Sequence, residues 1–172
     1  FLTQELTFLE ELKQPIVILG LEEQLNYQTS ITVNGEDIPI IFAGIIDRID
    51  RVNNQIRIID YKTGLVEPKD LKFSDFKEIE EQALTKVNQV LFYALLLQHK
   101  YPQYIESPLT AGMISFRKIS EGLICLTQDK NKTITTEMIK QFEELLKSIT
   151  AKIIDKNLPF KHNSDADYCN FC

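Results

Sequence analysis

Residues 44–64 read GIIDRIDRVNNQIRIIDYKTG, and this stretch decides the fold. Apolar residues alternate or run together on both sides of Asn53-Asn54, which predicts two β-strands. Asn tolerates positive φ better than most residues, so this pair suits a two-residue hairpin turn. The predicted register places the following residues opposite one another: Val52 and Gln55, Asp50 and Arg57, Ile49 and Ile58, and Asp47 and Asp60.

This register brings charged side chains together. Because side chains alternate along a strand, Asp47, Asp60 and Lys62 project from one face. Asp50 and Arg57 form a favourable pair on the other face, whereas two directly opposed carboxylates repel each other. A cation between Asp47 and Asp60, with Lys62 nearby, would relieve that repulsion. The alternative is a solvated hairpin end, and a three-residue turn would break the alignment altogether.

The segments before the hairpin predict a helix and further strands. Leucines spaced through residues 1–14 indicate a short amphipathic helix that ends at Pro15. Residues 16–33 predict one or two strands, followed by the strong turn signal Asn34-Gly35. The hairpin strands themselves span residues 38–50 and 55–62. Thr63-Gly64 closes the last strand, and the region from Pro68 to Asp75 predicts a loop.

The segment after this loop predicts one long helix over residues 77–100, which Pro102 stops. Its buried stripe comprises Ile79, Ala83, Val87, Val90, Leu91, Ala94 and Leu95. A second set recurs at spacings of four and three on a neighbouring face, and comprises Gln82, Lys86, Gln89 and Tyr93. The spacing alone indicates that this second set lies on a solvent-exposed flank of the helix.

The last third of the chain predicts a second hairpin and a second helix. The hairpin covers residues 109–117 and 122–128, with its turn at residues 120–122, and the amphipathic helix covers residues 134–156. An antiparallel-rich sheet with helices packed against it is the natural arrangement of this element order. We therefore predict an α/β or α+β fold, with residues 1–172 forming a single domain.

Composition restricts the class of protein. A chain of 172 residues with 44% hydrophobic residues can bury a full core. The net charge of −6 gives no general attraction to nucleic acid or to anionic membranes. No apolar run approaches a membrane span, and three cysteines do not make a secreted disulfide framework, so we expect a cytoplasmic protein. The chain lacks an initial Met and stops on the last cysteine of a Cys-x-x-Cys pair, so we expect a fragment of a longer protein.

Few motifs in the sequence carry chemistry. It contains no phosphate-binding glycine loop and no Gly-x-Ser-x-Gly, and His99 and His162 belong to no recognisable triad. The remaining group of residues that could carry out chemistry is Asp47, Asp60 and Lys62. Carboxylates suit hard cations such as Mg²⁺ or Mn²⁺, which polarise phosphoryl oxygens. A neighbouring lysine can orient water and offset negative charge.

Three segments together resemble the RecB-like nuclease domain of the PD-(D/E)XK superfamily. They are residues 43–50 (AGIIDRID), 58–64 (IIDYKTG) and 89–94 (QVLFYA), in the order and at the spacing typical of that family. The resemblance spans roughly residues 20–172. It is greatest to the C-terminal nuclease domains of RecB and AddB-type helicase–nucleases, and to related CRISPR-adaptation nucleases. It implies a restriction-endonuclease-like mixed sheet flanked by helices.

The resemblance also implies roles for individual residues. Asp47 and Asp60 would bind a divalent metal, with the Tyr61 carbonyl as a further ligand. Lys62 would be the catalytic lysine. Gln89 and Tyr93 would face the active site, which replaces their interpretation as a solvated flank.

Weaker candidates complete the predicted site. Lys86 lies on the same stripe and is a lesser candidate for phosphate contact, and Glu22 or Glu23 would supply an extra acid. The metal-binding His that family members carry on an N-terminal helix is missing here. Members with an iron–sulfur cluster use one early cysteine and three late ones.

Only part of that cluster motif is present. Cys169 and Cys172 match two of the late cysteines, so we expect no cluster in this chain, although one could form in a longer protein. The predicted function is a Mg²⁺- or Mn²⁺-dependent DNA exonuclease in repair and recombination, associated with a helicase. The alternative is a non-catalytic DNA-binding or assembly module on the same fold.

Overall fold

The central hairpin belongs to a five-stranded mixed sheet in a computed structural model that describes residues 7, 10, 15–82, 84–104 and 106–159. The strand order is β1-β2-β3-β5-β6, with β3 and β5 parallel and the other neighbours antiparallel. The bounds of these strands are β1 Ile16–Val33, β2 Glu36–Val52, β3 Gln55–Lys62, β5 Leu109–Ser115 and β6 Leu123–Cys125. The protein therefore has the predicted mixed α/β architecture.

Helices and short segments surround this sheet. The helices are α2 Phe76–Gln82, α3 Thr85–Lys100 and α4 Thr136–Ile154. A second, two-stranded sheet pairs β4 Lys72–Phe73 in parallel with β7 Thr127–Gln128. The 3₁₀ turns are η1 Pro68–Leu71, η2 Pro102–Tyr104 and η3 Phe116–Glu121.

The predicted register of the central hairpin is confirmed over most of its length. Asn53 adopts a φ of 56°, and Val52–Gln55, Asp50–Arg57 and Ile49–Ile58 are partners as expected. The fourth expected pair is wrong, because the ladder ends at Arg48–Ile59, one residue before Asp47 and Asp60.

The reason for this early end is a side chain. Asp47 Oδ2 accepts the Tyr61 backbone N–H at 2.8 Å and so satisfies a donor that a further ladder bond would have used. The backbones of β2 and β3 separate here. Beyond this point β2 pairs only with β1.

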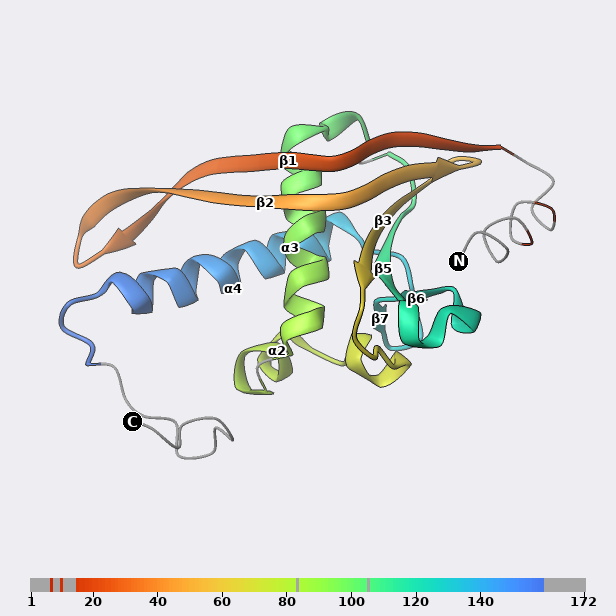
Figure 1. Cartoon of the computed structure of the whole chain (residues 1–172). Helices are drawn as coiled ribbons and strands as arrows, with labels where there is room; N and C mark the ends of the chain where they lie inside the picture. Colours follow the sequence, from red (N-terminus) through yellow and green to blue (C-terminus); the bar gives the residue numbers. More distant parts are fainter. Residues whose placement is uncertain (1–6, 8–9, 11–14, 83, 105, 160–172) are drawn as a thin grey trace.

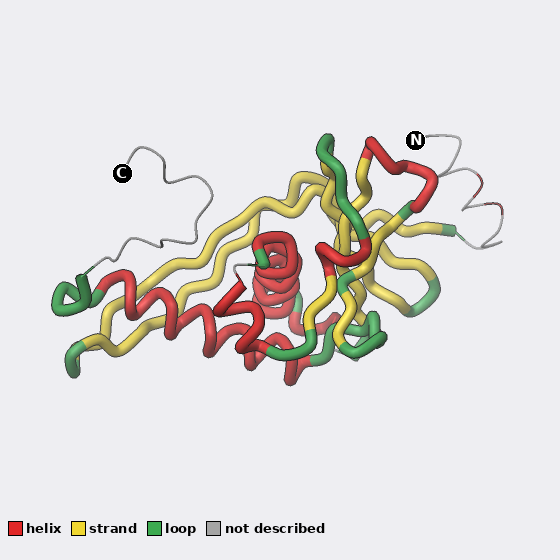
Figure 2. Tube along the Cα trace, turned by 90° about the horizontal axis from the view of Figure 1, so that it is seen from below, coloured by secondary structure: helices red, strands yellow, loops and turns green. Residues whose placement is uncertain are grey.

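Strands β1 and β2 therefore continue past the sheet as a long two-stranded ribbon (Figure 1). Asn34 and Gly35 turn its tip with φ values of 52° and 85°. One face of the ribbon packs on α3 and α4, as Figure 2 shows from below. At Gly44 an added Cβ would lie 3.2 Å from Leu96 Cδ1 of α3, so this glycine allows close packing of the helix on the sheet.

The parallel pairing of β3 and β5 was not predicted from the sequence. All residues of β5 are buried, as expected for a strand covered on both faces. The connection from β3 to β5 contains α3, whose buried residues form much of the core with the inner face of the sheet. This packing places the start of α3 beside the end of β3.

The prediction of one continuous helix over residues 77–100 is wrong. Two helices, α2 and α3, occupy this range, and Leu84 has the non-helical dihedral angles φ −65° and ψ 74°. Six members of the expected stripe are buried, while Ala83 and the side chain of Gln82 lie outside the described residues. The buried members are Ile79, Val87, Val90, Leu91, Ala94 and Leu95.

Four other segments also differ from the sequence prediction. Residues 116–121 form η3 rather than strand and turn, and residues 127–128 pair with β4 instead of continuing the second hairpin. Within the expected loop, residues 68–73 form η1 and β4. Ile134 forms a β-bridge with Leu109, so α4 begins only at Thr136.

Some predictions fall on residues that the structure does not describe. The amphipathic helix over residues 1–14 is one of them, apart from Thr7 and Glu10, and His162, Cys169 and Cys172 are the others. Among the described helices, none combines the length and apolar character needed to cross a membrane.

Candidate active site

Asp60 and Lys62 are paired at the end of β3. The Asp60 side chain is almost fully buried, and Lys62 Nζ lies 2.9 Å from Asp60 Oδ2. Oδ2 is nevertheless a buried oxygen without a hydrogen-bond partner of good geometry. We therefore treat the contact with Lys62 as an ion pair that leaves hydrogen-bonding capacity at Oδ2 unused.

The other oxygen of Asp60 is held from α3. Gln89 Nε2 donates to Asp60 Oδ1 at 3.0 Å, and the Tyr93 hydroxyl lies 3.4 Å from the same oxygen. Gln89 also donates to the Tyr93 hydroxyl at 2.7 Å, because residues four apart share one helix face. The structure thus brings both predicted helix residues to the predicted carboxylate.

Asp47 contributes a second carboxylate beside Asp60. Its Oδ2 accepts the Tyr61 N–H, and its negative charge acts on both Asp60 and Tyr93. Asp47 is only half-buried, so its carboxylate borders solvent. The two carboxylates, the lysine, the glutamine and the tyrosine therefore form one constellation.

Burial dominates the electrostatics of this constellation. Desolvation raises the pKa of Asp60 above its ordinary value, and the charge of Asp47 adds to the rise, although Lys62 opposes it. Desolvation also raises the pKa of Tyr93, so its hydroxyl keeps its proton at neutral pH. A further positive charge beside Asp60 would therefore stabilise its ionised form.

A divalent cation fits this donor set. Asp60 Oδ2 takes no hydrogen bond, and Asp47 lies close enough to raise the Asp60 pKa. Within residues 15–82, 84–104 and 106–159, no group of three or more His, Cys, Asp or Glu side chains is arranged to hold a metal. Two carboxylates and a backbone carbonyl still suit Mg²⁺ or Mn²⁺, which keep several waters as ligands.

The weaker candidates lie elsewhere or have other partners. Lys86 Nζ pairs with Asp70 Oδ2 at 3.2 Å rather than facing Asp60. The Tyr101 hydroxyl donates to Glu23 Oε1 at 2.7 Å, and Glu22 is exposed with a φ of 49°. Neither glutamate joins the two aspartates in a group of three.

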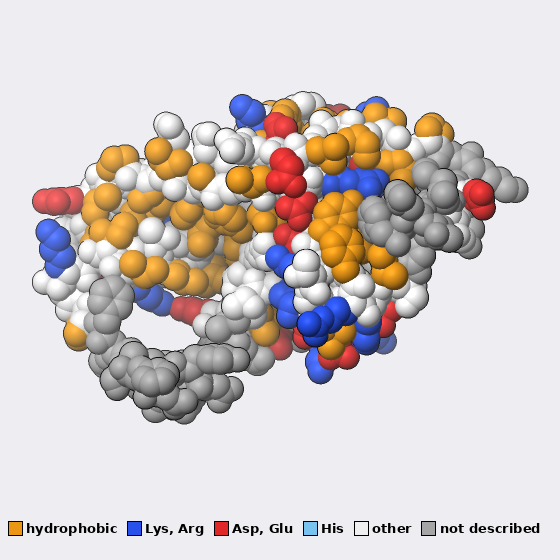
Figure 3. Space-filling model, viewed as in Figure 1, with side chains coloured by type: hydrophobic (Ala, Val, Ile, Leu, Met, Phe, Trp, Pro, Cys, Tyr) orange, Lys and Arg blue, Asp and Glu red, His pale blue; other side chains and the backbone are white. Residues whose placement is uncertain are grey.

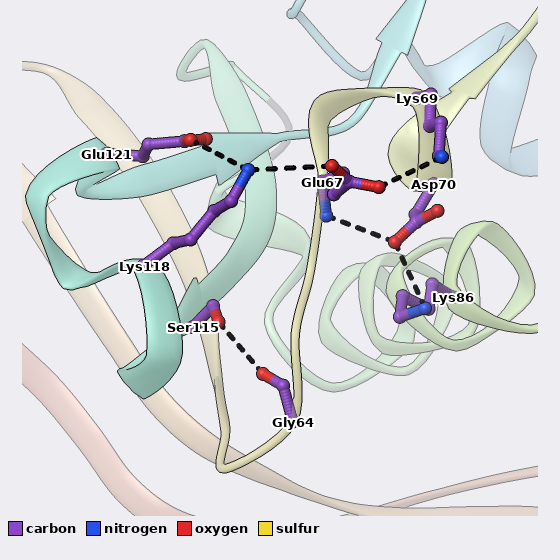
Figure 4. A network of polar contacts seen from close by, with 8 residues as sticks. All are labelled: Gly64, Glu67, Lys69, Asp70, Lys86, Ser115, Lys118 and Glu121. Atoms are coloured by element: carbon purple, nitrogen blue, oxygen red, sulfur yellow. Dashed lines mark hydrogen bonds and ion pairs between the residues drawn. The ribbon is translucent and has the colours of Figure 1, made fainter.

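Polar contacts fix the loop that follows Lys62. Ser115 Oγ donates to the Gly64 carbonyl at 2.8 Å, and Lys118 lies between Glu67 and Glu121 (Figure 4). The same network reaches Lys86 of α3 through Asp70, which caps η1. These contacts join the loop, η3 and α3 around the candidate site.

Sequence reasoning missed two features near the site. Asp50 binds both Arg57 and Arg48, whereas only the pair with Arg57 was expected from the register. Tyr61 stacks on Phe116, which comes from η3. No local pattern indicates the second feature, because it depends on the parallel pairing of β3 with β5.

A second hollow of the molecule lies away from these carboxylates. A cavity of about 410 Å³ lies between the end of α3 and the start of α4, and its lining includes Leu97, Tyr104, Thr133 and Ile139. None of the lining residues belongs to the constellation around Asp60. The candidate site is therefore defined by the chemistry of its side chains and not by a cavity.

A family model described as the PD-(D/E)XK nuclease superfamily matches residues 2–172. The chain belongs to this superfamily. The match agrees with the resemblance noted in residues 43–94 but does not distinguish a RecB or AddB type within the superfamily. Comparisons with curated proteins and with solved structures gave no significant match. The mixed sheet and flanking helices are those expected of a PD-(D/E)XK nuclease.

Proposed function

We propose that this PD-(D/E)XK protein is a Mg²⁺- or Mn²⁺-dependent deoxyribonuclease of the RecB or AddB type. The observation that carries the proposal is the Asp60 carboxylate, which is held by Gln89 on one oxygen and faces Lys62 with the other. A buried acid with one oxygen unused and a neighbouring lysine is costly for a purely structural role. A divalent ion and a phosphate would give both groups a function.

The proposed chemistry is hydrolysis of a phosphodiester. Asp47, Asp60 and the Tyr61 carbonyl would hold the cation, which would polarise the phosphoryl oxygen and lower the pKa of bound water. Lys62 would orient the attacking water and offset the charge that develops on the phosphate. The water oxygen bonds to phosphorus, the bond to the leaving sugar oxygen breaks, and that oxygen takes up a proton. Gln89 and Tyr93 would keep the Asp60 carboxylate in position.

The biological setting is proposed from the RecB-like resemblance. We infer a cytoplasmic exonuclease acting in DNA repair and recombination, as one nuclease domain of a longer helicase–nuclease. An iron–sulfur cluster would need cysteines in addition to Cys169 and Cys172. The net charge of −6 agrees with a helicase partner supplying part of the DNA affinity.

Cleavage of labelled DNA tests this proposal. Single- and double-stranded substrates are incubated with Mg²⁺ or Mn²⁺, and we expect cleavage that Asp60→Asn and Lys62→Ala reduce to background. Asp37→Asn and Lys152→Ala, both exposed, are matched controls that should cut at the parental rate. Parental rates in both site variants would refute the site. DNA binding without cleavage in either metal would favour the non-catalytic module.

Calorimetric titration with Mn²⁺ tests the metal site separately. Because burial raises the pKa of Asp60, protons still compete with the cation for this carboxylate at pH values above 3.8, the ordinary pKa of Asp. We expect Mn²⁺ affinity to weaken as the pH falls through this raised pKa, and to be lost in Asp47→Ala. Heats that are equal in wild type and Asp47→Ala would contradict a site at these carboxylates.

A further inference from the structure

Gly64 follows Lys62 by two residues and is a glycine that the surrounding fold does not require. Its φ lies outside the left-handed region, in contrast to those of Gly35 and Gly122. A Cβ built on Gly64 would have no atom of the described residues within 4 Å apart from its two chain neighbours, whereas a Cβ at Gly112 would collide with backbone. Glycine loses more conformational freedom on folding than any other residue. The open space beside Gly64 therefore calls for an explanation outside the fold.

Gly64 is bonded from the side of β3 that carries the Asp60 carboxylate. Paired residues of neighbouring strands project to the same face of a sheet, so Ser115 shares the face of its partner Lys62. Asp60 lies on this face too, because it stands two residues before Lys62 in β3. From this face the Ser115 Oγ donates to the Gly64 carbonyl at 2.8 Å (Figure 4). Two residues of chain span at most about 7 Å, so the Gly64 backbone lies close to Lys62.

The Gly64 backbone is held in place by the protein itself. Ser115 is fully buried and stands at the N-cap of η3, yet its side chain does not cap that turn and bonds Gly64 instead. Farther along the same loop, Lys118 of η3 lies 3.5 Å from Glu67, and Asp70 accepts the Glu67 N–H at 3.0 Å. Little conformational entropy would therefore be lost when a ligand contacts this loop.

The Gly64 N–H is a donor that a phosphate can use. It has no acceptor among the residues that the structure describes, and backbone N–H groups commonly bind phosphate oxygens of nucleic acids. Figure 3, in the view of Figure 1, shows acidic side chains in the middle of one face with basic side chains directly below them. Successive phosphates of one DNA strand are about 3.4 Å apart along the helix axis. A strand whose cleaved phosphate lies at Asp60 and Lys62 would therefore bring a neighbouring phosphate within reach of Gly64.

We propose that Gly64 is the position at which the sugar–phosphate backbone of the bound DNA strand approaches the protein, next to the phosphate that is cleaved at Asp60. The missing side chain gives the DNA backbone room, and the Gly64 N–H donates to a phosphate oxygen. Ser115 is the positioning residue of this contact, because its hydroxyl holds the Gly64 carbonyl. This inference rests on the proposed nuclease function and adds a substrate contact to it.

Side chains of increasing size at Gly64 test the inference on the whole chain. Fluorescence anisotropy measures the binding of labelled single-stranded DNA at low salt in EDTA, which prevents metal-dependent cleavage. We expect Gly64→Ala to weaken binding about 5-fold and Gly64→Val up to about 150-fold, while both variants resist urea at least as well as wild type. The matched control is Gly20→Ala on β1, where an added Cβ makes only ordinary contacts from 3.4 Å outward, and it should bind DNA like wild type.

The outcomes separate the contact at Gly64 from the nuclease function. Equal DNA affinities in wild type and both Gly64 variants, a wild type that binds no DNA, or Gly64 variants that unfold at lower urea would each overturn the contact, even if the wild type cleaves DNA. Affinity that falls with side-chain size, in a protein that cuts no DNA, would support the contact and refute the nuclease function instead.

Ser115→Ala tests the positioning role. We expect it to weaken DNA binding about 5-fold while leaving the Mn²⁺ affinity measured by calorimetry unchanged, because Ser115 bonds Gly64 and not the two aspartates. A loss of Mn²⁺ affinity equal to the loss of DNA affinity would show a general structural effect and refute the positioning role.

Discussion

Gln89 on α3 donates a hydrogen bond of 3.0 Å to Asp60 Oδ1 on β3. This bond occupies one carboxylate oxygen and leaves Oδ2 directed at Lys62. The helix therefore determines which oxygen of Asp60 remains for other ligands. Groups that orient a ligand in this way commonly affect function nearly as much as the ligand itself.

Replacing Gln89 by Ala should impair catalysis through Asp60. Without the amide, the buried carboxylate loses the hydrogen bond of 3.0 Å at Oδ1, and losing a donor to the ionised form should raise its pKa further. We expect about a 10- to 100-fold fall in kcat or in Mn²⁺ affinity, with the pH profile shifted upward. Steady-state cleavage across pH measures both effects.

Two comparisons make this prediction specific to the site. Tyr93→Phe should have a smaller effect than Gln89→Ala, because the Tyr93 hydroxyl is 3.4 Å from Asp60. Gln98→Ala on the same helix should leave kcat unchanged. An unchanged pH profile in Gln89→Ala would show that Gln89 does not act through Asp60.

Asp50→Asn should destabilise the hairpin strongly. Asp50 is fully buried, accepts two hydrogen bonds from Arg57 at 2.7 and 2.8 Å, and pairs with Arg48 at 2.7 Å. Removing its charge leaves two buried cations without this carboxylate, which costs about 3–5 kcal/mol. Urea unfolding measures the loss, and the exposed control Asp37→Asn should change stability by less than about 0.5 kcal/mol. Equal stabilities of the two variants would contradict this role for Asp50.

Gly112→Ala should destabilise the junction of β5 and β6. A Cβ at Gly112 would collide with the Ile124 carbonyl oxygen and lie 2.8 Å from the Cys125 Cα. Backbone atoms cannot move aside as a flexible side chain can, so we expect a loss of about 1–3 kcal/mol. Gly64→Ala is the control, since an added Cβ there meets nothing within 4 Å. A Gly112→Ala protein as stable as Gly64→Ala in urea would refute the close approach of these strands.

The sequence predicted features that depend on neighbouring residues. The turn at Asn53 and the pairing of Asp50 with Arg57 follow from local conformational preference and charge. Gln89 and Tyr93 could be linked to each other by their spacing, but only the family resemblance linked them to Asp60. The structure brings these residues together, while their catalytic roles stay a prediction.

Features that depend on distant contacts were not predictable in this way. The break before Thr85 has no Gly or Pro to mark it. The ladder ends at Arg48 because a side chain, Asp47, takes the place of a backbone acceptor. The parallel pairing that places Phe116 beside Tyr61 joins segments separated by α3. Periodicity along one segment contains no information about such partners.

A pH-dependent contact fastens the β1–β2 ribbon to α4. Glu143 accepts from the Tyr27 hydroxyl at 2.7 Å, pairs with Lys147 at 2.7 Å, and lies 3.2 Å from His99 Nε2. Burial alone would raise the pKa of Glu143, but the hydrogen bonds from Lys147, Tyr27 and His99 outweigh burial and lower it. The ionised form of Glu143 therefore stabilises the folded state.

The lowered pKa of Glu143 fixes the direction of the pH effect. Its stabilising contribution is present above the ordinary Glu value of about 4.5 and is lost as the pH falls through the lower folded-state pKa. Glu143→Gln should reduce the free energy of unfolding by about 1–2 kcal/mol at neutral pH, and should lose less stability than wild type on acidification. Urea unfolding at several pH values measures both quantities. The exposed neighbour Glu144→Gln should keep the wild-type pH dependence, and identical pH profiles for Glu143→Gln and wild type would exclude Glu143 as the group that fastens the ribbon.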